Sequence, residues 1–454
     1  MTVGLKWSAQ IFALPGLVLG LHVATARGAD LMDLYALAAQ SDPTFQSATH
    51  ALEAAKQKRP EAFSALLPLF SANGTDGRTS GSTRYTGTSA IDRSFNSDQW
   101  ALQLSQPIFR ADRLLVYGEA KATVEQALAV YAAAREDLML RLSRAYFDEI
   151  VAERNVTAAR AQLVSLNEQL EAARHSFEVG VASVTDVDDS RSRAASAQAQ
   201  QVSAMNDLES ARAALEAITG EPLLKLASLP AQTPLPKPIP SDAASWVQRA
   251  TEDNPNVRAA QALAKVAQYE VDRNRAQRLP QVDLIATYGG NYSGGNITEP
   301  VNYDTIVHDK QVTLQVTVPL LDGGGIHAQV AEARAQRAKA ESDVNVAQRQ
   351  AALDARQSYS AAVSGVSQVE ALEAAVAAGQ SAVKGNRVGY GLGLRINSDV
   401  LNAEQQLYTT MHDLDKARYD TLYAGLKLKA ATGQLTEEDL RGINAMLVSA
   451  DGST

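Results

Sequence analysis

The sequence contains the same plan twice, with matching landmarks 212 or 213 residues apart. Three prolines and three residues of predicted turns recur in this way: Pro43, Pro68, Pro107, Gly180, Asp186 and Gly220 correspond to Pro255, Pro280, Pro319, Gly393, Asp399 and Gly433. The separation changes by one residue after the third proline, which indicates a single insertion. Copies of this length are a duplicated structural unit, not a short solenoid repeat. Both halves of the chain must therefore adopt one architecture.

The N-terminal residues have the order of a secretory signal. Lys6 precedes an apolar run from residue 11 to residue 21, and Ala24-Thr25-Ala26 follows. Such a run is too short to span a bilayer as a mature helix. We expect residues 1–29 to be a signal peptide, cleaved between Ala26 and Ala29; an uncleaved membrane anchor is the alternative.

Composition restricts the function classes further. The chain has no cysteine, so its stability must come from packing or assembly, and no lipid-modified cysteine can stand at a mature N-terminus. The formal net charge of -9 is not typical of a protein that binds nucleic acid, which needs a basic surface for the phosphates. After the signal, no stretch of 18 apolar residues follows. A transmembrane helix is not expected, whereas membrane β-strands remain possible because each needs only about 10 alternating residues.

Two spans without proline predict very long helices. No proline occurs between Pro107 and Pro222 or after Pro319, and residues with high helix propensity dominate both spans. The expected segments are helices over 112–174 and 184–219 with a turn at Gly180, and helices over 326–384 and 398–432 with a turn over 389–393. At 1.5 Å per residue the outgoing helices are roughly 90 Å long. This length is typical of coiled coils or helical tubes.

Immediately before each long helix, apolar and polar residues alternate strictly. In the segment 99–105, Trp100, Leu102 and Leu104 share one face, and the segment 311–318 alternates in the same way. Partner strands are predicted to begin at Pro68 and Pro280, with exposed hairpin loops over 75–96 and 289–308. Each copy therefore supplies one hairpin. Four strands are too few to close a membrane barrel, which needs about eight, so either the sheet is soluble or several chains pool their strands.

The remaining segments complete the predicted domain organisation. The first repeat covers 30–220 and the second covers 242–434, each opened by short helical stretches with turns at Asp42-Pro43 and Asn254-Pro255. Between them, 221–241 is rich in proline and is expected to be an extended linker outside the helical bundle. The segment 435–454 is expected to be a polar C-terminal tail that packs loosely beside the linker.

No motif in the chain predicts catalysis or a cofactor. The six histidines show no metal-binding spacing such as H-E-x-x-H, and G-x-S-x-G does not occur. The run 323–325 is Gly-Gly-Gly after a strand and before a helix, but no Gly-Lys-Ser/Thr follows, so we interpret it as a flexible elbow and not as a phosphate loop. The expected site is therefore neither catalytic nor metal-binding.

The turn sequences carry a family resemblance. Residues 177–187, FEVGVASVTDV, and residues 391–403, GLGLRINSDVLNA, together with the signal peptide and the duplicated prolines, resemble the TolC-like outer membrane factors of Gram-negative bacteria over nearly the whole mature chain. The resemblance implies a mainly α fold with membrane β-strands. In that family, three chains form one 12-stranded β-barrel, four strands from each, and their antiparallel helical pairs continue it as an α-barrel tunnel through the periplasm. The apolar face of each strand would then meet lipid.

The resemblance also implies a gate at the periplasmic tip of the tunnel. Tyr390 and Arg395 occupy the positions of the tyrosine and arginine that bond to the first copy's turn, and Thr185 and Asp186 occupy the positions of their partners. Arginine suits such a latch because it donates in a fork. The alternative is that Arg395 and Asp186 form only a surface ion pair, worth about 0 to 1 kcal/mol.

Two further positions match the constriction of the pore. Asp399 corresponds to an acidic ring, in which three converging carboxylates would repel each other and attract cations. The second ring position is Asn402, a departure from the acidic residue of the best-known family member. A weaker preference for cations is expected, and a gate built on two charged rings is in doubt.

The predicted function is a passive duct in the outer membrane, without enzymatic activity. The resemblance implies a homotrimer in outer membrane lipid that a periplasmic adaptor protein joins to an inner membrane ABC or proton-driven transporter. Secreted polypeptides, through type I secretion, and small toxic molecules remain alternative cargoes; the missing anchor cysteine favours secretion slightly. The alternatives from other classes are a periplasmic adaptor or coiled-coil scaffold and, more remotely, an exported hydrolase.

Overall fold

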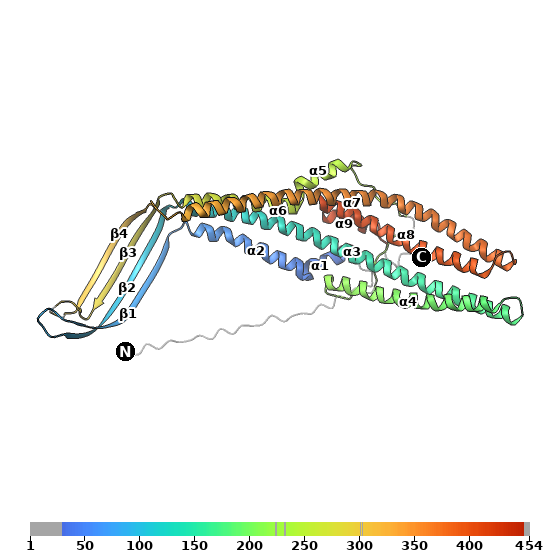
Figure 1. Ribbon diagram of the computed structural model, residues 1–454, viewed down its shortest axis with the longest axis horizontal. Coiled ribbons are helices and arrows are strands. Elements are labelled where there is room, and N and C mark those ends of the chain that lie inside the picture. Colours follow the sequence, from blue (N-terminus) through green and yellow to red (C-terminus); the bar gives the residue numbers. More distant parts are fainter. Residues whose placement is uncertain (1–29, 223–224, 231–232, 300, 302, 449–454) are drawn as a thin grey trace, which may run out of the picture.

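A computed structural model describes residues 30–448 except 223–224, 231–232, 300 and 302. The predicted signal peptide and the last six residues lie outside the described residues. The chain is a long rod. The β-sheet lies at one end, and the turns that connect the paired long helices lie at the other (Figure 1). The connection between the two repeats and the C-terminal helix lie near the middle of the rod (Figure 1).

Each repeat contributes two short helices, two strands and a pair of long helices. The first repeat contains α1 (Leu31–Ser41), α2 (Pro43–Ser64), β1 (Leu69–Thr83), β2 (Ile91–Phe109), α3 (Ala111–Glu178) and α4 (Val184–Thr219). The second contains α5 (Ala243–Asp253), α6 (Pro255–Ala276), β3 (Gln281–Ser293), β4 (Thr305–Thr317), α7 (Gly325–Gly391) and α8 (Asn397–Ala431), and α9 (Glu437–Asn444) follows. The predicted long antiparallel helical pairs are confirmed, and both outgoing helices are longer than expected, at about 100 Å each.

The strands form an antiparallel sheet in the order β1-β2-β3-β4. The register aligns Ala72 with Leu102 and Leu102 with Tyr288, so the alternating apolar residues of all four strands share one face. The expected loops over 75–96 and 289–308 are wrong in extent, because strand pairing continues through most of these polar residues. The hairpin connections are only 84–90 and 294–304. Polar Gly, Ser and Thr residues favour loops locally, but the ladder hydrogen bonds of a neighbouring strand override that preference.

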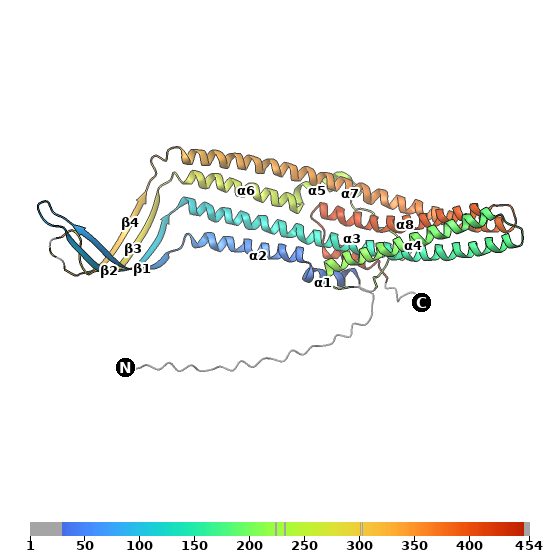
Figure 2. The same cartoon turned by 60° about the horizontal axis from the view of Figure 1, so that its bottom comes forward.

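The long helices lie side by side in two arrangements along the rod. Near the sheet, α2 contacts α3, α3 contacts α6 and α6 contacts α7, which gives a curved layer of helices (Figure 2). Toward the tip, α3 pairs with α4 and α7 pairs with α8, while α3 also contacts α8. Alanines such as Ala194, Ala197 and Ala204 are buried in the tip half, where small side chains allow close approach of the helices.

The largest hydrophobic core lies in the middle of the rod and includes the linker and the tail. Leu229 of the linker is 1% exposed, and the Tyr146 hydroxyl donates to the Ala227 carbonyl at 2.7 Å. In the tail, Leu440 of α9 is fully buried. The expectations of a linker outside the bundle and of a loosely packed tail are therefore wrong. In both segments a few leucines among polar residues determine the packing.

Candidate channel gate at the helical tip

The two turns at the tip have the same backbone construction. In the first, Val181 N donates to Ser176 O at 2.8 Å, and in the second, Leu394 N donates to Gly389 O at 2.8 Å. These bonds end α3 and α7 in the Schellman manner, which requires a left-handed residue at the turn. Gly180, with φ of 82°, and Gly393, with φ of 75°, supply it. The predicted turn glycines therefore have equivalent roles in the two copies.

In the first turn, Thr185 and Asp186 belong to the start of α4. Asp186 and Ser183 form a capping box: Asp186 N donates to Ser183 Oγ at 3.2 Å, and Ser183 N donates to Asp186 Oδ2 at 3.0 Å. The hydroxyl groups of Thr185 and Ser183 lie 2.5 Å apart. Asp186 therefore satisfies a backbone group of its own turn, and Thr185 bonds to the side chain of Ser183 in the same turn.

In the second turn, Arg395 pairs within its own segment. Its Nη1 lies 3.7 Å from Oδ2 of Asp399, one helical turn further on, and the Arg395 side chain is 59% exposed. The stem of Arg395 lies against Gly389, where a Cβ atom would be 2.8 Å from Arg395 Cγ. Tyr390 lies just before the turn, and its carbonyl accepts from Gly393 N at 3.0 Å. The predicted constriction residue Asp399 and the predicted latch residue Arg395 thus lie side by side.

The two predicted halves of the latch do not meet within one protomer. Among the described residues, no hydrogen bond or ion pair joins Tyr390 or Arg395 to Thr185 or Asp186. The simple ion pair between Arg395 and Asp186, the alternative to the latch, is also not formed inside the chain, since Arg395 pairs with Asp399. The latch assignment stays a prediction.

Asn402 connects the two helical pairs. Its side-chain oxygen accepts a hydrogen bond from Arg193 Nη2 of α4 at 2.8 Å, and Arg193 Nη1 donates to Gln405 Oε1 at 3.2 Å. Deeper in the same interface, Asn397 Nδ2 donates to Ser190 Oγ at 2.8 Å, and both side chains are buried. These bonds link the first three turns of α8 to α4.

A buried charged cluster above the turns was missed by sequence reasoning. Glu404 of α8 is 2% exposed and accepts from Arg387 Nε of α7 at 2.9 Å and from Ser165 Oγ of α3 at 3.1 Å. Arg387 Nη2 also donates to Ser165 Oγ at 2.9 Å, which closes the triangle. The available signal was spacing: Glu404 follows the buried Leu401 by three residues, on the same face of α8.

Leu401 supplies the apolar part of the same contact. It is 1% exposed and packs among side chains of α3 and α4: Leu166, Leu170, Ala173, Val187, Ala194 and Ala197. The second helical pair is therefore fixed to the first by an apolar residue flanked by polar contacts.

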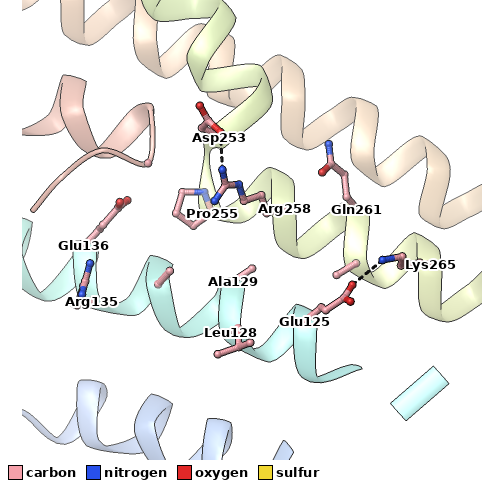
Figure 3. A pocket seen from close by; sticks show the side chains of 13 residues that line it. Glu125, Leu128, Ala129, Arg135, Glu136, Asp253, Pro255, Arg258, Gln261 and Lys265 are labelled. Carbon is pink, nitrogen blue, oxygen red and sulfur yellow. Dashed lines mark hydrogen bonds and ion pairs between the residues drawn. The ribbon is translucent and has the colours of Figure 1, made fainter. Parts of the chain in front are cut away.

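Cavities lie between helices of the protomer. One of about 690 Å³ lies between α3 and α6, and its charged lining is largely paired, with Asp253 bound to Arg258 at 2.6 Å and Glu125 to Lys265 at 2.8 Å (Figure 3). Burial raises the pKa of Glu136 at its edge to about 8. No group of three or more potential metal ligands occurs in the described part of the chain.

A sheet with one apolar face, joined to two long helical pairs that end in a packed tip, defines the protomer of an outer membrane channel. Among the described helices, none combines the length and the apolar character needed to cross a bilayer. The model of the family described as "Outer membrane efflux protein" matches residues 34–221 and 246–434. The chain belongs to this TolC-like family of outer membrane efflux and secretion channels of Gram-negative bacteria.

Individual relatives agree with this assignment. The chain is 32% identical to the alkaline protease secretion protein AprF of Pseudomonas aeruginosa over 426 residues, which cover 93% of this chain and 88% of AprF. It is 29% identical to the outer membrane protein TolC of Escherichia coli, over 95% of this chain and 88% of TolC. The outer membrane channel CmeC of Campylobacter jejuni has the same fold, with a TM-score of 0.76 at 17% identity over 98% of this chain and 97% of CmeC.

Family membership confirms the predicted class, fold and location. The protein is a transport channel of the outer membrane and not an enzyme, which excludes the exported hydrolase. It is also not the periplasmic adaptor or scaffold considered as an alternative. The family model does not name residues of the gate, so their roles are part of the proposal below.

Proposed function

We propose that three copies of this chain form one continuous passive duct for secreted polypeptide. The observation that carries the proposal is the open sheet: in the described residues β1 pairs only with β2, and β4 only with β3. An open edge leaves backbone groups unpaired, which lipid cannot satisfy. Four strands are too few for a barrel, whereas three copies joined from β4 to β1 give a closed barrel of 12 strands.

The helices support the same assembly. Large apolar side chains remain exposed along the rod, among them Val164 of α3, Val202 of α4 and Val346 of α7, at 58%, 64% and 66%. Burial of these side chains between copies would add to the stability of such an assembly. In a trimer, α7 of one copy would lie against α2 of the next, continuing the lateral order that each protomer begins.

For cargo, we favour secreted polypeptide over small molecules. The support is the likeness to AprF, whose name describes secretion of an alkaline protease. A type I system would add a periplasmic adaptor and an inner membrane ABC transporter. Small-molecule efflux with a proton-driven transporter is the second candidate, and the family description "Outer membrane efflux protein" supports it.

The gate would act between copies of the chain. Arg395 and Tyr390 of one copy would bond to Thr185 and Asp186 of a neighbour. The capping box uses Oδ2 of Asp186, and no hydrogen bond to its Oδ1 occurs in the described residues, so that oxygen can accept from an incoming guanidinium. Asp399 would form the charged constriction. Asn402 would stay bound to Arg193 and would not form a second acidic ring.

Two experiments test these proposals. Outer membrane fractions should contain a trimer that survives unheated detergent gels, and a chain recovered soluble from the periplasm would refute the duct. Deletion of the gene should abolish export of a repeat-containing polypeptide by the neighbouring ABC transporter; unchanged export with lost drug resistance would favour the efflux alternative.

For the latch, the double substitution Arg395→Ser with Tyr390→Phe should raise single-channel conductance in planar bilayers. The matched control is Arg191→Ser, which removes another exposed tip arginine, paired with Asp188 at 2.8 Å. If conductance does not change in the double variant, the latch assignment is wrong.

A further inference from the structure

The hairpin of β1 and β2 projects beyond the hairpin of β3 and β4 at the end of the sheet away from the helices. β1 pairs with β2 as far as Thr83 and Ile91, whereas the pairing of β2 with β3 ends at Ser97 and Ser293. Both hairpin connections lie at this outer end of the rod (Figure 1). After β3 the chain turns onto the projecting part of the first hairpin. We name residues 294–299, which make this turn, the strap.

The strap contacts both strands of the first hairpin. Gly294 N donates to Asn96 O at 2.8 Å, and Thr83 Oγ1 donates to Ile297 O at 2.6 Å. The Ile297 side chain lies over Gly81, where a Cβ atom would be 3.2 Å from Ile297 Cδ1. A large side chain at position 81 would therefore displace the isoleucine. The strap is thus attached through its backbone and through one apolar side chain.

An arginine of β2 adds a charged attachment. Arg93 Nη1 donates to the carbonyl oxygen of Asn296 at 2.9 Å and lies 3.2 Å from the side-chain oxygen of the same residue. It also contacts the carbonyl oxygen of Glu299. Within the strap, Glu299 N donates to Asn296 Oδ1 at 2.6 Å. Hydrogen bonds from a guanidinium are stronger than those between neutral groups, so removal of Arg93 should loosen the strap more than loss of a neutral contact.

The strap covers the polar face of the sheet. The register between β1 and β2 is unbroken and side chains alternate between the faces, so Arg93 and Thr83 lie on the face of Gln99, opposite to Trp100. Burial in the projecting hairpin follows the same alternation. Residues on the polar face are partly buried, at positions 79, 81, 83, 93, 95 and 97, whereas those between them are exposed, at positions 80, 82, 92, 94, 96 and 98. The cover is therefore confined to one face.

In the proposed barrel the polar face lines water and the apolar face meets lipid. The strap then lies inside the barrel wall, at the mouth opposite to the helical tip. A layer packed face to face on a sheet occupies about 10 Å, so each strap takes a comparable depth from the lumen. Residues 295–299 are outside the strand ladder. Segments attached by a few exposed hydrogen bonds open at a lower free energy than paired strands, so the strap can be released while the sheet stays folded.

We propose that the strap is an outer constriction of the duct. Three bound straps, one from each copy, narrow the extracellular mouth against molecules that enter from outside. When the contacts of Arg93 break, each strap extends away from the lumen and leaves the full width of the barrel to a departing polypeptide. This inference rests on the proposed trimeric duct. It adds a second narrow point at the other end of the molecule from the predicted latch.

Exclusion of neutral polymers measures the width of each mouth. The intact trimer is inserted into planar bilayers from one side, and poly(ethylene glycol) of graded mass is added on the outer or the tip side. Polymers that enter the duct lower the single-channel conductance, whereas polymers above an exclusion limit do not. Arg93→Ala should raise the exclusion limit on the outer side and leave it unchanged on the tip side. Arg78→Ala is the matched control, because Arg78 of the same hairpin binds Ser94 Oγ at 2.9 Å on the opposite face.

Two changes at Gly81 test the same contact without removal of the arginine. Gly81→Leu should displace Ile297 and should also raise the outer exclusion limit. Gly81→Cys with Ile297→Cys should form a disulfide, because Ile297 Cγ2 lies 3.8 Å from the Cβ position at residue 81 and the chain has no cysteine of its own. Oxidised trimers should lose export of the polypeptide, and reduction should restore it. Each single cysteine variant is the control, and unheated gels verify that every variant is trimeric.

If Arg93→Ala and Gly81→Leu form conducting trimers with the outer exclusion limit of Arg78→Ala, the straps do not narrow the mouth and the proposal is wrong, while the duct stands. A lower limit in these variants would show that the bound strap keeps the mouth open, which would also overturn it. Export that continues through oxidised trimers would refute the release of the strap. Absence of channels in the parent protein would instead refute the duct.

Discussion

The turn between α3 and α4 and the turn between α7 and α8 have the same backbone conformation, but their polar groups form different hydrogen bonds and ion pairs. Both outgoing helices end on a left-handed glycine with the same pair of hydrogen bonds. After the first turn, Ser183 caps α4 and forms the capping box with Asp186. The corresponding residues of the second turn are Ile396, which offers no side-chain cap, and Asp399, which pairs with Arg395. The side chains of the first turn therefore cap the helix that follows it, whereas no side chain caps the start of α8 in the second turn.

This difference indicates that the two helical pairs have acquired different roles since the duplication. The first helical pair is a fixed support, because its turn is complete without help. The second pair is fixed by contacts that cross between helices, through Glu404, Leu401 and Asn397. Contacts between separate helices can break when one helical pair moves away from the other. The hydrogen bonds of a capping box break only if the start of their own helix unfolds. The movable part of the tip is therefore expected to be the second pair.

The largest effect should come from Arg387→Ala. The Glu404 side chain is 3% exposed while that of Arg387 is 55% exposed, so removal of the arginine leaves a buried carboxylate with only Ser165 as a partner. Loss of one partner of a buried pair costs about 3 kcal/mol or more. Hydrogen exchange should rise in α8 near Glu404 and stay unchanged in the first turns of α4.

The converse substitution makes the test specific. Glu404→Gln leaves an arginine that can turn to water and keeps an acceptor for Ser165, so it should cost less, and it should partly rescue Arg387→Ala. Glu168→Ala on α3, an exposed site, is the matched control. If Arg387→Ala and Glu404→Gln lower the free energy of unfolding equally, the deeper burial of Glu404 has no effect on stability.

The comparison of the repeats extends to the middle of the long helices, where the next largest effect is expected. Glu136 of α3 is 8% exposed, while Arg349, at or next to the corresponding position of α7, is exposed. Burial raises the Glu136 pKa from 4.5 to about 8, partly offset by Arg135. Between these two values the folded protein retains a proton that the unfolded chain loses, so stability falls as pH rises from about 4.5 to 8.

Glu136→Gln should remove this pH dependence. The variant should match the parent near pH 4 and be more stable by up to about 4 kcal/mol at pH 8, since the neutral amide needs no proton to remain buried. Thermal unfolding of the trimer over this pH range measures the difference. Glu171→Gln, at a site 69% exposed on the same helix, should show no such trend; a parallel gain in both variants would contradict the explanation by burial.

A smaller effect is expected from exchanging the caps of the two tips. Ser183→Ala should destabilise the start of α4 by about 1 kcal/mol, because it removes the acceptor for Asp186 N. Ile396→Ser should stabilise the start of α8 by a similar amount, since it supplies a cap that is missing there. Exchange of backbone amides in the first turn of each helix reports both. If Ile396→Ser has no effect, the second tip is not limited by its missing cap.

Sequence reasoning identified the features that depend on local chemistry. Gly180 and Gly393 could be assigned to turns because only glycine readily adopts the left-handed backbone there, and the alternation around Trp100 gave the lipid-suitable face of the strands. It missed Glu404, because a charged residue on a helix is ordinarily solvated, and its burial depends on a helix more than 200 residues away. The extent of the strands was missed for the same reason. Their polar ends remain in strand conformation because they pair with neighbouring strands, although their residues have low β-strand propensity.

The smallest effect on stability, and the sharpest test of the difference between the tips, should come from Asp399→Asn. The pair that it breaks is exposed and 3.7 Å long, so the cost should stay below about 1 kcal/mol. Selectivity should nevertheless change: if three copies of Asp399 converge on the duct axis, their removal lowers cation preference, measured as a shift of reversal potential under a salt gradient. Asp189→Asn at the first tip, which breaks a pair of similar length with Arg193, removes the same charge. A shift in both variants would mean that the two tips contribute equally to the pore, whereas a shift in Asp399→Asn alone would place the constriction on the second tip, whose turn has no side-chain cap.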